Sequence, residues 1–188
     1  RLDCPWKDEL IFDRSKEAVV QRRVRRWGAI VLAEEPTRTP ASPDVMAQVL
    51  YEAARNRFER LFPLDGEAGD LLARLRFCLR TRPEEAWPAW ITDPESLLLE
   101  WCHGRRSFSG LRKLNVAEDL LSRIPWDLRK VVDQLAPERL RVPSGAMIRL
   151  QYVDDKPPIL AARIQQMFGM MSTPQIGGMP IMVHLLAP

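Results

Sequence analysis

The chain has few of the residues from which nucleotide-binding loops and metal sites are built. Among 188 residues there are nine glycines, three cysteines and two histidines. No G-x-x-x-x-G-K-[ST] or G-x-G-x-x-G pattern occurs, so no such loop is available to hold phosphates on backbone N–H groups. The cysteines and histidines also lack the short paired spacings of zinc sites. We therefore expect no catalytic residue, no cofactor-binding residue and no metal ligand in this chain.

Long apolar runs, paired cysteines and an excess of one charge are missing as well. No stretch approaches the roughly 18–20 apolar residues of a membrane helix, so we expect no membrane-spanning segment. Cys4, Cys78 and Cys102 are odd in number and far apart. This pattern predicts free thiols, with Cys78 and Cys102 as small core residues, and a reducing, cytoplasmic location. The net charge of +3 is too small to indicate nucleic-acid binding without regard to where the charges lie.

The first forty residues read as strands. Short runs at 9–13, 18–21 and 29–32 are rich in β-branched residues and predict antiparallel strands. Three prolines at 36, 40 and 43 then mark a linker. We therefore expect a β-rich segment over 1–40 and a second domain over 41–188. Since the first residue is Arg1 and not methionine, we also expect a piece of a longer protein.

The middle of the chain predicts helices from their start signals. Ser42 before Pro43, Asp93 before Pro94, and Pro125 each suit a helix N-terminus, and Asn115 with Glu118 approximates a capping box. Each start is followed by apolar residues at helical spacing. The expected buried stripes are Val45, Val49, Leu50 and Ala53, then Leu71, Leu72, Leu75, Cys78 and Leu79, then Leu97, Leu98 and Trp101, then Leu128, Val131, Val132 and Leu135.

The last fifty residues predict mixed structure. Alternating arginines and apolar residues around Pro143-Ser144-Gly145 predict a β-hairpin over 138–153, followed by a loop to 158. Leu160, Ile164, Met167 and Phe168 have helical spacing before Gly169, and 181–186 reads as a final strand. The fold class is therefore α+β, with an N-terminal antiparallel β segment, a mainly helical domain, a hairpin and a C-terminal strand.

The densest positive charge lies in one predicted strand. Arg22, Arg23, Arg25 and Arg26 occupy four of five positions and are followed by Trp27. Because alternate strand residues take opposite faces, these arginines place charge on both faces. Arginine suits phosphate through its bidentate fork, and Trp27 could stack on a base. The simpler alternative is a solvated strand face with a buried tryptophan.

Two further features are open to more than one interpretation. Arg105 and Arg106, with Arg112 and Lys113, form a second basic patch, which either contacts nucleic acid or is simply solvated. The chain has six tryptophans, and the loop at 87–90, Trp-Pro-Ala-Trp, is a candidate for docking against another domain.

Several ordered segments together resemble one family. They are GAIVLAEEP at 28–36, PWDLR at 125–129, LAPERL at 135–140, VPSG at 142–145, PPILAARIQQMFG at 157–169 and IMVHLLAP at 181–188. In this order they are similar to the C-terminal region of the bacterial HrpB-type ATP-dependent helicases, relatives of the DEAH-box RNA helicases. Gln151 departs from the pattern, since an acidic residue is usual there.

The resemblance implies a non-catalytic accessory region. By this likeness, two RecA-like motor domains that bind ATP and Mg lie upstream, and this region contacts RNA or single-stranded nucleic acid or docks on the motor. It also implies that the N-terminal strands belong to an OB-like barrel. The alternative is a protein–protein interaction module without nucleic-acid contact, and a free-standing enzyme of unknown class ranks third.

Overall fold

The chain forms two compact units, and each unit is built from two separate stretches of sequence. The computed structural model describes residues 4–37 and 39–187. The first unit comprises Arg1–Pro63 and Pro94–Leu114, and the second comprises Leu64–Asp93 and Asn115–Pro188. Residue 40, where we expected one domain to end, lies inside the first unit between its strands and its first helix. As a domain boundary it stays a prediction.

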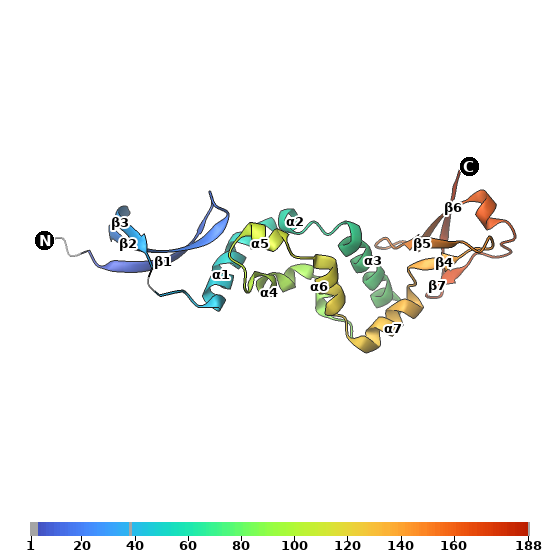
Figure 1. The fold of residues 1–188 in the computed structure, drawn as a ribbon. Helices are drawn as coiled ribbons and strands as arrows, with labels where there is room; N and C mark the ends of the chain where they lie inside the picture. Colours follow the sequence, from blue (N-terminus) through green and yellow to red (C-terminus); the bar gives the residue numbers. More distant parts are fainter. Residues whose placement is uncertain (1–3, 38, 188) are drawn as a thin grey trace. The chain divides into compact units, whose positions relative to one another are not determined.

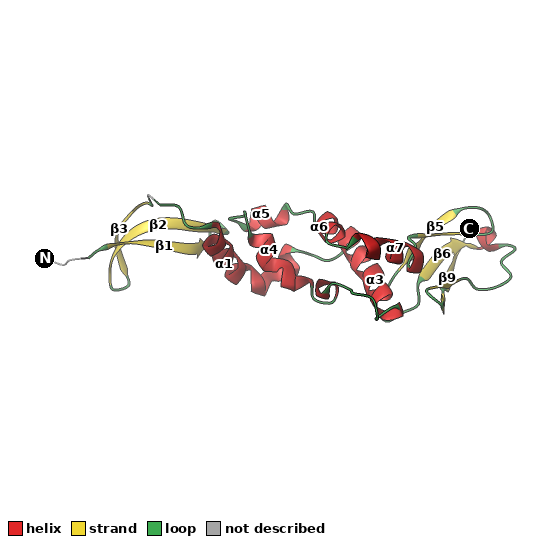
Figure 2. Cartoon of the chain, turned by 90° about the horizontal axis from the view of Figure 1, so that it is seen from below, coloured by secondary structure: helices red, strands yellow, loops and turns green. Residues whose placement is uncertain are grey.

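The first unit begins with a three-stranded antiparallel sheet (Figure 2). Its strands are β1 (Trp6–Asp13), β2 (Ala18–Trp27) and β3 (Ile30–Pro36), in that order. This confirms the N-terminal antiparallel segment. Within the described residues the sheet stays open at β1 and β3, so the OB-like barrel is not confirmed. All seven residues of β3 are exposed, so no other element of the first unit buries the side chains of this outer strand.

Short helices complete the first unit. They are α1 (Pro43–Ala54), the 3-10 turn η1 (Arg55–Arg57), α2 (Phe58–Leu61), η3 (Pro94–Leu97), α4 (Leu98–Cys102) and α5 (Phe108–Arg112). The Ser42 hydroxyl accepts a hydrogen bond from the backbone N–H of Val45 at 3.3 Å, which confirms the predicted cap. The expected stripe on α1 was partly wrong. Val45 is 52% exposed, while Met46, Ala47, Leu50 and Ala54 are buried.

An aromatic cluster joins the two stretches of the first unit. The rings of Phe58 and Phe62 lie 6.0 and 4.8 Å from that of Trp101, measured between centroids. In Figure 1 the yellow-green helices α4 and α5 return to the side of the cyan helices α1 and α2. Residues 94–114 are thus part of this core although about thirty residues of the other unit separate them from Pro63.

The second unit starts with helices around α3 (Gly66–Thr81). The others are η2 (Ala89–Ile91), α6 (Val116–Ser122) and α7 (Trp126–Leu135). On α3, Leu72, Leu75 and Cys78 are buried as expected. The Asn115 side chain accepts from the backbone N–H of Glu118 at 3.2 Å, which confirms Asn115 as the N-cap of the predicted capping box.

The tryptophan loop at 87–90 is partly buried in the second unit. Trp90 is buried, and the Trp87 indole donates to the Arg82 carbonyl at 2.7 Å. Both rings therefore have contacts within the unit, and the docking role considered for this loop stays a prediction.

A four-stranded sheet follows, in the order β4-β5-β6-β9. Its strands are β4 (Arg139–Arg141), β5 (Met147–Gln151), β6 (Ile159–Arg163) and β9 (Met182–Leu186), with a separate pair β7 (Gln175–Ile176) and β8 (Met179–Pro180). The hairpin and the C-terminal strand are confirmed. The helix expected over 160–168 was wrong, because 159–163 is a strand that pairs with β5 and, in parallel, with β9. Only the 3-10 turn η4 (Ile164–Met167) follows it.

Candidate nucleic-acid interface

The four arginines of β2 divide between the two faces of the first sheet. Glu9 stands opposite Arg22 and Trp6 stands opposite Arg25 across the β1–β2 pairing. Since side chains alternate along a strand, Arg22 and Arg26 share one face, and Arg23 and Arg25 share the other. The expectation that charge appears on both faces is consistent with this register. The two faces have different partners.

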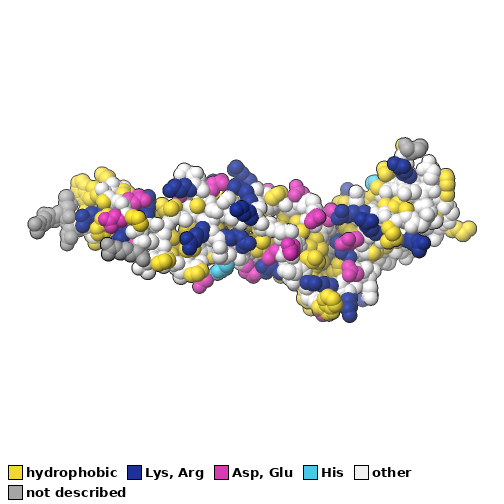
Figure 3. Space-filling view, viewed as in Figure 1, with side chains coloured by type: hydrophobic (Ala, Val, Ile, Leu, Met, Phe, Trp, Pro, Cys, Tyr) yellow, Lys and Arg dark blue, Asp and Glu magenta, His cyan; other side chains and the backbone are white. Residues whose placement is uncertain are grey.

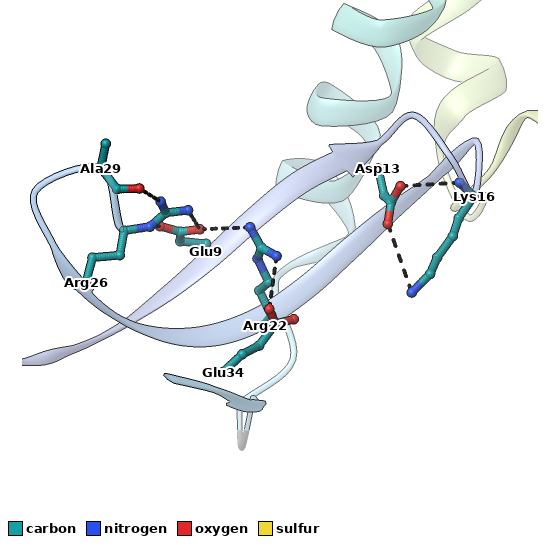
Figure 4. A network of polar contacts seen from close by, with 7 residues as sticks. All are labelled: Glu9, Asp13, Lys16, Arg22, Arg26, Ala29 and Glu34. Carbon is teal, nitrogen blue, oxygen red and sulfur yellow. Dashed lines mark hydrogen bonds and ion pairs between the residues drawn. The ribbon is translucent and has the colours of Figure 1, made fainter. Parts of the chain in front are cut away.

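On the first face the guanidiniums are held by carboxylates. Arg26 Nε lies 2.7 Å and its Nη2 2.9 Å from the two Glu9 oxygens, a bidentate pair. Arg22 Nη1 lies 3.1 Å from Glu34, and its Nη2 lies 3.7 Å from Glu9. Figure 4 shows this chain of contacts from Arg26 through Glu9 and Arg22 to Glu34. Val24, which lies between the two arginines on the same face, is only 1% exposed.

The protonation equilibria of this face follow from the same contacts. The hydrogen bonds from Arg26 are the largest influence and lower the pKa of Glu9. Burial opposes them, and the charges of Arg26 and Arg22 lower the pKa further. In return, the hydrogen bonds to Glu9 raise the pKa of Arg26. Arg22 and Arg26 are therefore engaged in structural ion pairs, and a ligand phosphate would have to displace a carboxylate to reach them.

On the second face the guanidiniums meet an aromatic ring. The Cζ atoms of Arg23 and Arg25 lie 5.8 and 5.4 Å from the centroid of Trp6, within cation–π range. Neither guanidinium has an ion pair with any residue in the described part of the chain. Alternation places Trp27 on this face too, and its side chain is 56% exposed. Asp8 on β1 and Glu35 on β3 stand across from Arg23 but form no ion pair with it. This face therefore offers two guanidiniums without an ion pair and an accessible indole.

Arg105 and Arg106 of the second basic patch lie at the other end of β2. The Arg106 carbonyl accepts from the backbone N–H of Val19 at 2.7 Å. Val19 is six residues before Arg25, or about 20 Å along an extended strand. The side chain of Arg105 donates to the Trp101 carbonyl at 2.9 Å, while Arg106 is exposed. The structure therefore does not bring Arg105 and Arg106 together with the Arg23–Trp27 face.

The described residues hold no group of His, Cys, Asp and Glu side chains suited to a metal ion. The three thiols are free and buried. Burial raises the pKa of Cys78 to about 12 and that of Cys102 to about 11. Neither thiol can therefore supply an appreciable amount of thiolate near neutral pH, and both fit the predicted role of small core residues.

A groove of about 480 Å³ lies within the second unit, between α3, α6 and the β4–β5 hairpin. Its walls include both guanidiniums and carboxylates, and several of these pair with one another. Arg74 contacts Glu138 at 3.1 Å, and Arg149 contacts Asp70 at 2.8 Å. On the face drawn in Figure 3, basic and acidic side chains are likewise interspersed. The charges in this groove are largely matched, which does not favour binding of a polyanion inside it.

Sequence reasoning missed the partners of the arginines. Trp6 was counted only as one of six tryptophans, and Glu9 only as part of an apolar run. These partners could have been found from the residue pairing that a hairpin turn imposes on its two strands. Once the turn is placed between Asp13 and Ala18, residues whose numbers add to 31 face each other, as Trp6 and Arg25 do.

No helix in the described residues is both long and apolar enough to cross a membrane.

Comparison with known proteins gives one consistent result. Residues 97–188 match the family model described as "ATP-dependent helicase C-terminal", HrpB_C. The chain is also 30% identical over 198 aligned residues to the ATP-dependent RNA helicase HrpB of Escherichia coli K12. That alignment covers 98% of this chain and 24% of the relative.

Solved structures of the same relative have a similar fold. One crystal structure of E. coli HrpB, described as a DExH-box NTPase, matches with a TM-score of 0.69 and 28% identity over 98% of this chain. A second, described as a DEAH/RHA helicase, matches with a TM-score of 0.67 and 27% identity over 97%. In both, the match covers 24% of the solved chain. The chain thus spans about a quarter of the length of the relatives it matches.

Proposed function

Because the chain belongs to the C-terminal region of HrpB-type ATP-dependent helicases, we propose that it is a non-catalytic accessory surface that contacts single-stranded nucleic acid, RNA in the first instance. In this proposal ATP and Mg are bound by motor domains elsewhere in the whole protein, and those domains are its partners. The three free, buried thiols support a reducing compartment such as the cytoplasm.

The observation that carries the proposal is the face of β2 that presents Arg23, Arg25 and Trp27. Two guanidiniums without carboxylate partners in the described chain stand two residues apart beside an exposed indole. Each guanidinium can donate two parallel hydrogen bonds to a phosphate, and the indole can stack on any base. Such a surface holds a strand without reading its sequence, which suits a protein that moves along nucleic acid.

Trp6 positions this face. Its ring lies within 6 Å of both guanidiniums, so it limits their rotamers while leaving their N–H groups free to donate. Arg22 and Arg26 have a different role. Their ion pairs on the opposite face stabilise the sheet that carries the site.

Titration with a fluorescent oligouridylate at several salt concentrations tests the proposal. If Arg23 and Arg25 each neutralise a phosphate, the double variant Arg23→Ala/Arg25→Ala should make the slope of log affinity against log salt shallower by roughly 1.4. The matched control is Arg14→Ala/Lys16→Ala, which removes two exposed charges near the other end of the same hairpin. It should leave the slope within error of the unsubstituted chain. Absence of binding at about 50 mM salt would exclude nucleic-acid contact by this chain.

The second candidate is a docking surface for protein, and a specific observation favours it. Ile30, Val31 and Leu32 on β3 of the first unit are exposed. Large exposed apolar side chains are typical of interaction surfaces. If oligouridylate does not bind, this becomes the better function for the chain.

A further inference from the structure

The β4–β5 hairpin of the second unit presents three arginines on one face. Arg139 stands directly opposite Arg149, and Arg141 stands opposite Met147. All four side chains are exposed. The intervening residues turn the other way, since Leu140 and Ile148 are half-buried and Leu150 is buried. The hairpin is therefore an amphipathic ribbon whose outer face is basic.

This arrangement works against the stability of the hairpin. Like charges directly opposite each other across an antiparallel pair are unfavourable. Arg149 has a compensating contact with Asp70 at 2.8 Å, but both side chains are 61% exposed. Arg139 and Arg141 have no ion pair with any described residue, and the adjacent Glu138 is engaged by Arg74 at 3.1 Å. Nothing in the packing of the second unit requires the two unpaired guanidiniums.

We propose that this outer face is a second phosphate-binding surface, for the backbone of single-stranded nucleic acid. The proposal rests on the function proposed above and adds a site in the other unit. Arg139 and Arg141 are two residues apart on a strand, about 6.5 Å, so they can contact neighbouring phosphates of one strand. A phosphate between the guanidiniums turns their repulsion into shared attraction, and each can bind it as a fork.

The neighbouring carboxylates define where the strand can lie. Arg139 and Arg149 line the groove together with Glu67 and Glu118, whereas Arg141 and Met147 do not. The carboxylates disfavour a polyanion inside the groove, so we expect the strand to run from Arg139 toward Arg141 and Met147. Met147, 54% exposed and opposite Arg141, gives an apolar contact for a sugar or base. A regular row of cations on a flat ribbon suits a ligand with regularly repeating charge better than it suits an acidic peptide.

The same salt titration tests this site with Arg139→Ala/Arg141→Ala. We expect the slope with oligouridylate to become shallower by roughly 1.4. The melting temperature of the free variant should be unchanged or higher, because a like-charge contact is removed. The charge-matched control Arg82→Ala/Lys156→Ala, both exposed and outside the hairpin, should change neither the slope nor the pattern of binding.

The outcomes separate this site from the first one. If the unsubstituted chain does not bind oligouridylate at all, both proposals are wrong. If Arg23→Ala/Arg25→Ala flattens the slope while Arg139→Ala/Arg141→Ala behaves as its control, only the hairpin site is wrong. A clear fall in melting temperature of the hairpin variant would show that the arginines are structural. Equal binding of polyglutamate and oligouridylate would overturn the choice of ligand.

Discussion

The two sheets of this chain use arginine in opposite ways. On the first face of β2, Arg22 and Arg26 stand near Glu9 and Glu34, and the four side chains form one connected set of ion pairs. On the β4–β5 hairpin an arginine stands opposite another arginine. The sequence patterns differ, since β2 carries four arginines in five positions, whereas arginines alternate with apolar residues in β4. The residue across the pairing does not alone decide whether a guanidinium is held in an ion pair, because Arg22 stands opposite Glu9 and pairs with it, whereas Arg23 stands opposite Asp8 and Glu35 and forms no ion pair with the described residues.

The sheets also differ in where their apolar residues lie. In the second sheet β6 is central, with Leu160 fully buried and Ile159 and Ala162 nearly so. In the first sheet the outer strand β3 exposes Ile30, Val31 and Leu32. In the first sheet the buried apolar strand residues are Val19 and Val24 of β2, while β3 contributes none.

The largest change in the free energy of unfolding is expected when a buried leucine of the second sheet is compared with an exposed leucine of the first. Leu160→Ala should lower the free energy of unfolding by about 3 kcal/mol, since it leaves a cavity at a fully buried position. Leu32→Ala, at a position 52% exposed, should change it by less than about 0.5 kcal/mol. Urea denaturation followed by circular dichroism measures both. Similar losses in the two variants would mean that β3 is covered in solution.

The next-largest effect is expected from a comparison of two arginines that both form ion pairs. Arg74 in the second unit is buried, donates to the Ala136 carbonyl, and contacts Asp133 and Glu138 at 2.7 and 3.1 Å. Arg74→Ala should cost about 2 kcal/mol, because a buried carbonyl loses its donor. The carboxylates are largely exposed and stay hydrated, which limits the loss. Arg26→Ala, at a half-buried site, should cost less in the same denaturation experiment. A larger loss for Arg26→Ala would reverse this ranking.

The smallest effect is a pH dependence in the first sheet. The folded pKa of Glu9 is below its ordinary value of 4.5, so its ion pairs add stability above that pH. This contribution is lost as the pH falls through the lowered pKa of the folded state. When the pH falls from about 5 to about 3, the free energy of unfolding of Glu9→Gln should therefore decrease less than that of the unsubstituted chain. Thermal melts at several pH values measure the difference, and parallel curves for the two chains would contradict it.

Local signals in the sequence predicted the elements whose cause is local. The caps at Ser42 and Asn115 and the hairpin around Pro143-Ser144-Gly145 depend on residues within a few positions, and all three are confirmed. The segment 160–168 was wrong for the opposite reason. Its apolar spacing suits a helix, but 159–163 has strand partners on both sides, and one of them is more than twenty residues later in the chain.

The candidate site was predictable in part for the same reason. Arg22 to Trp27 could be assigned to a strand with charge on both faces from alternation alone. Which arginines are paired could not be predicted, because it depends on the register that sets Glu9 and Trp6 against them. The burial of Met46 in place of Val45 on α1 likewise depends on packing against α4, which lies more than forty residues away in the sequence.

Because the two units alternate along the sequence, this arrangement affects both the folding of the chain during synthesis and the choice of truncation points. During synthesis the first unit lacks α4 and α5 until residue 114 has left the ribosome, after residues 64–93 of the second unit. Domains usually fold in the order in which they emerge, but here neither can finish before the other has begun. A truncated chain that starts at residue 97, where the family match begins, would contain neither unit whole.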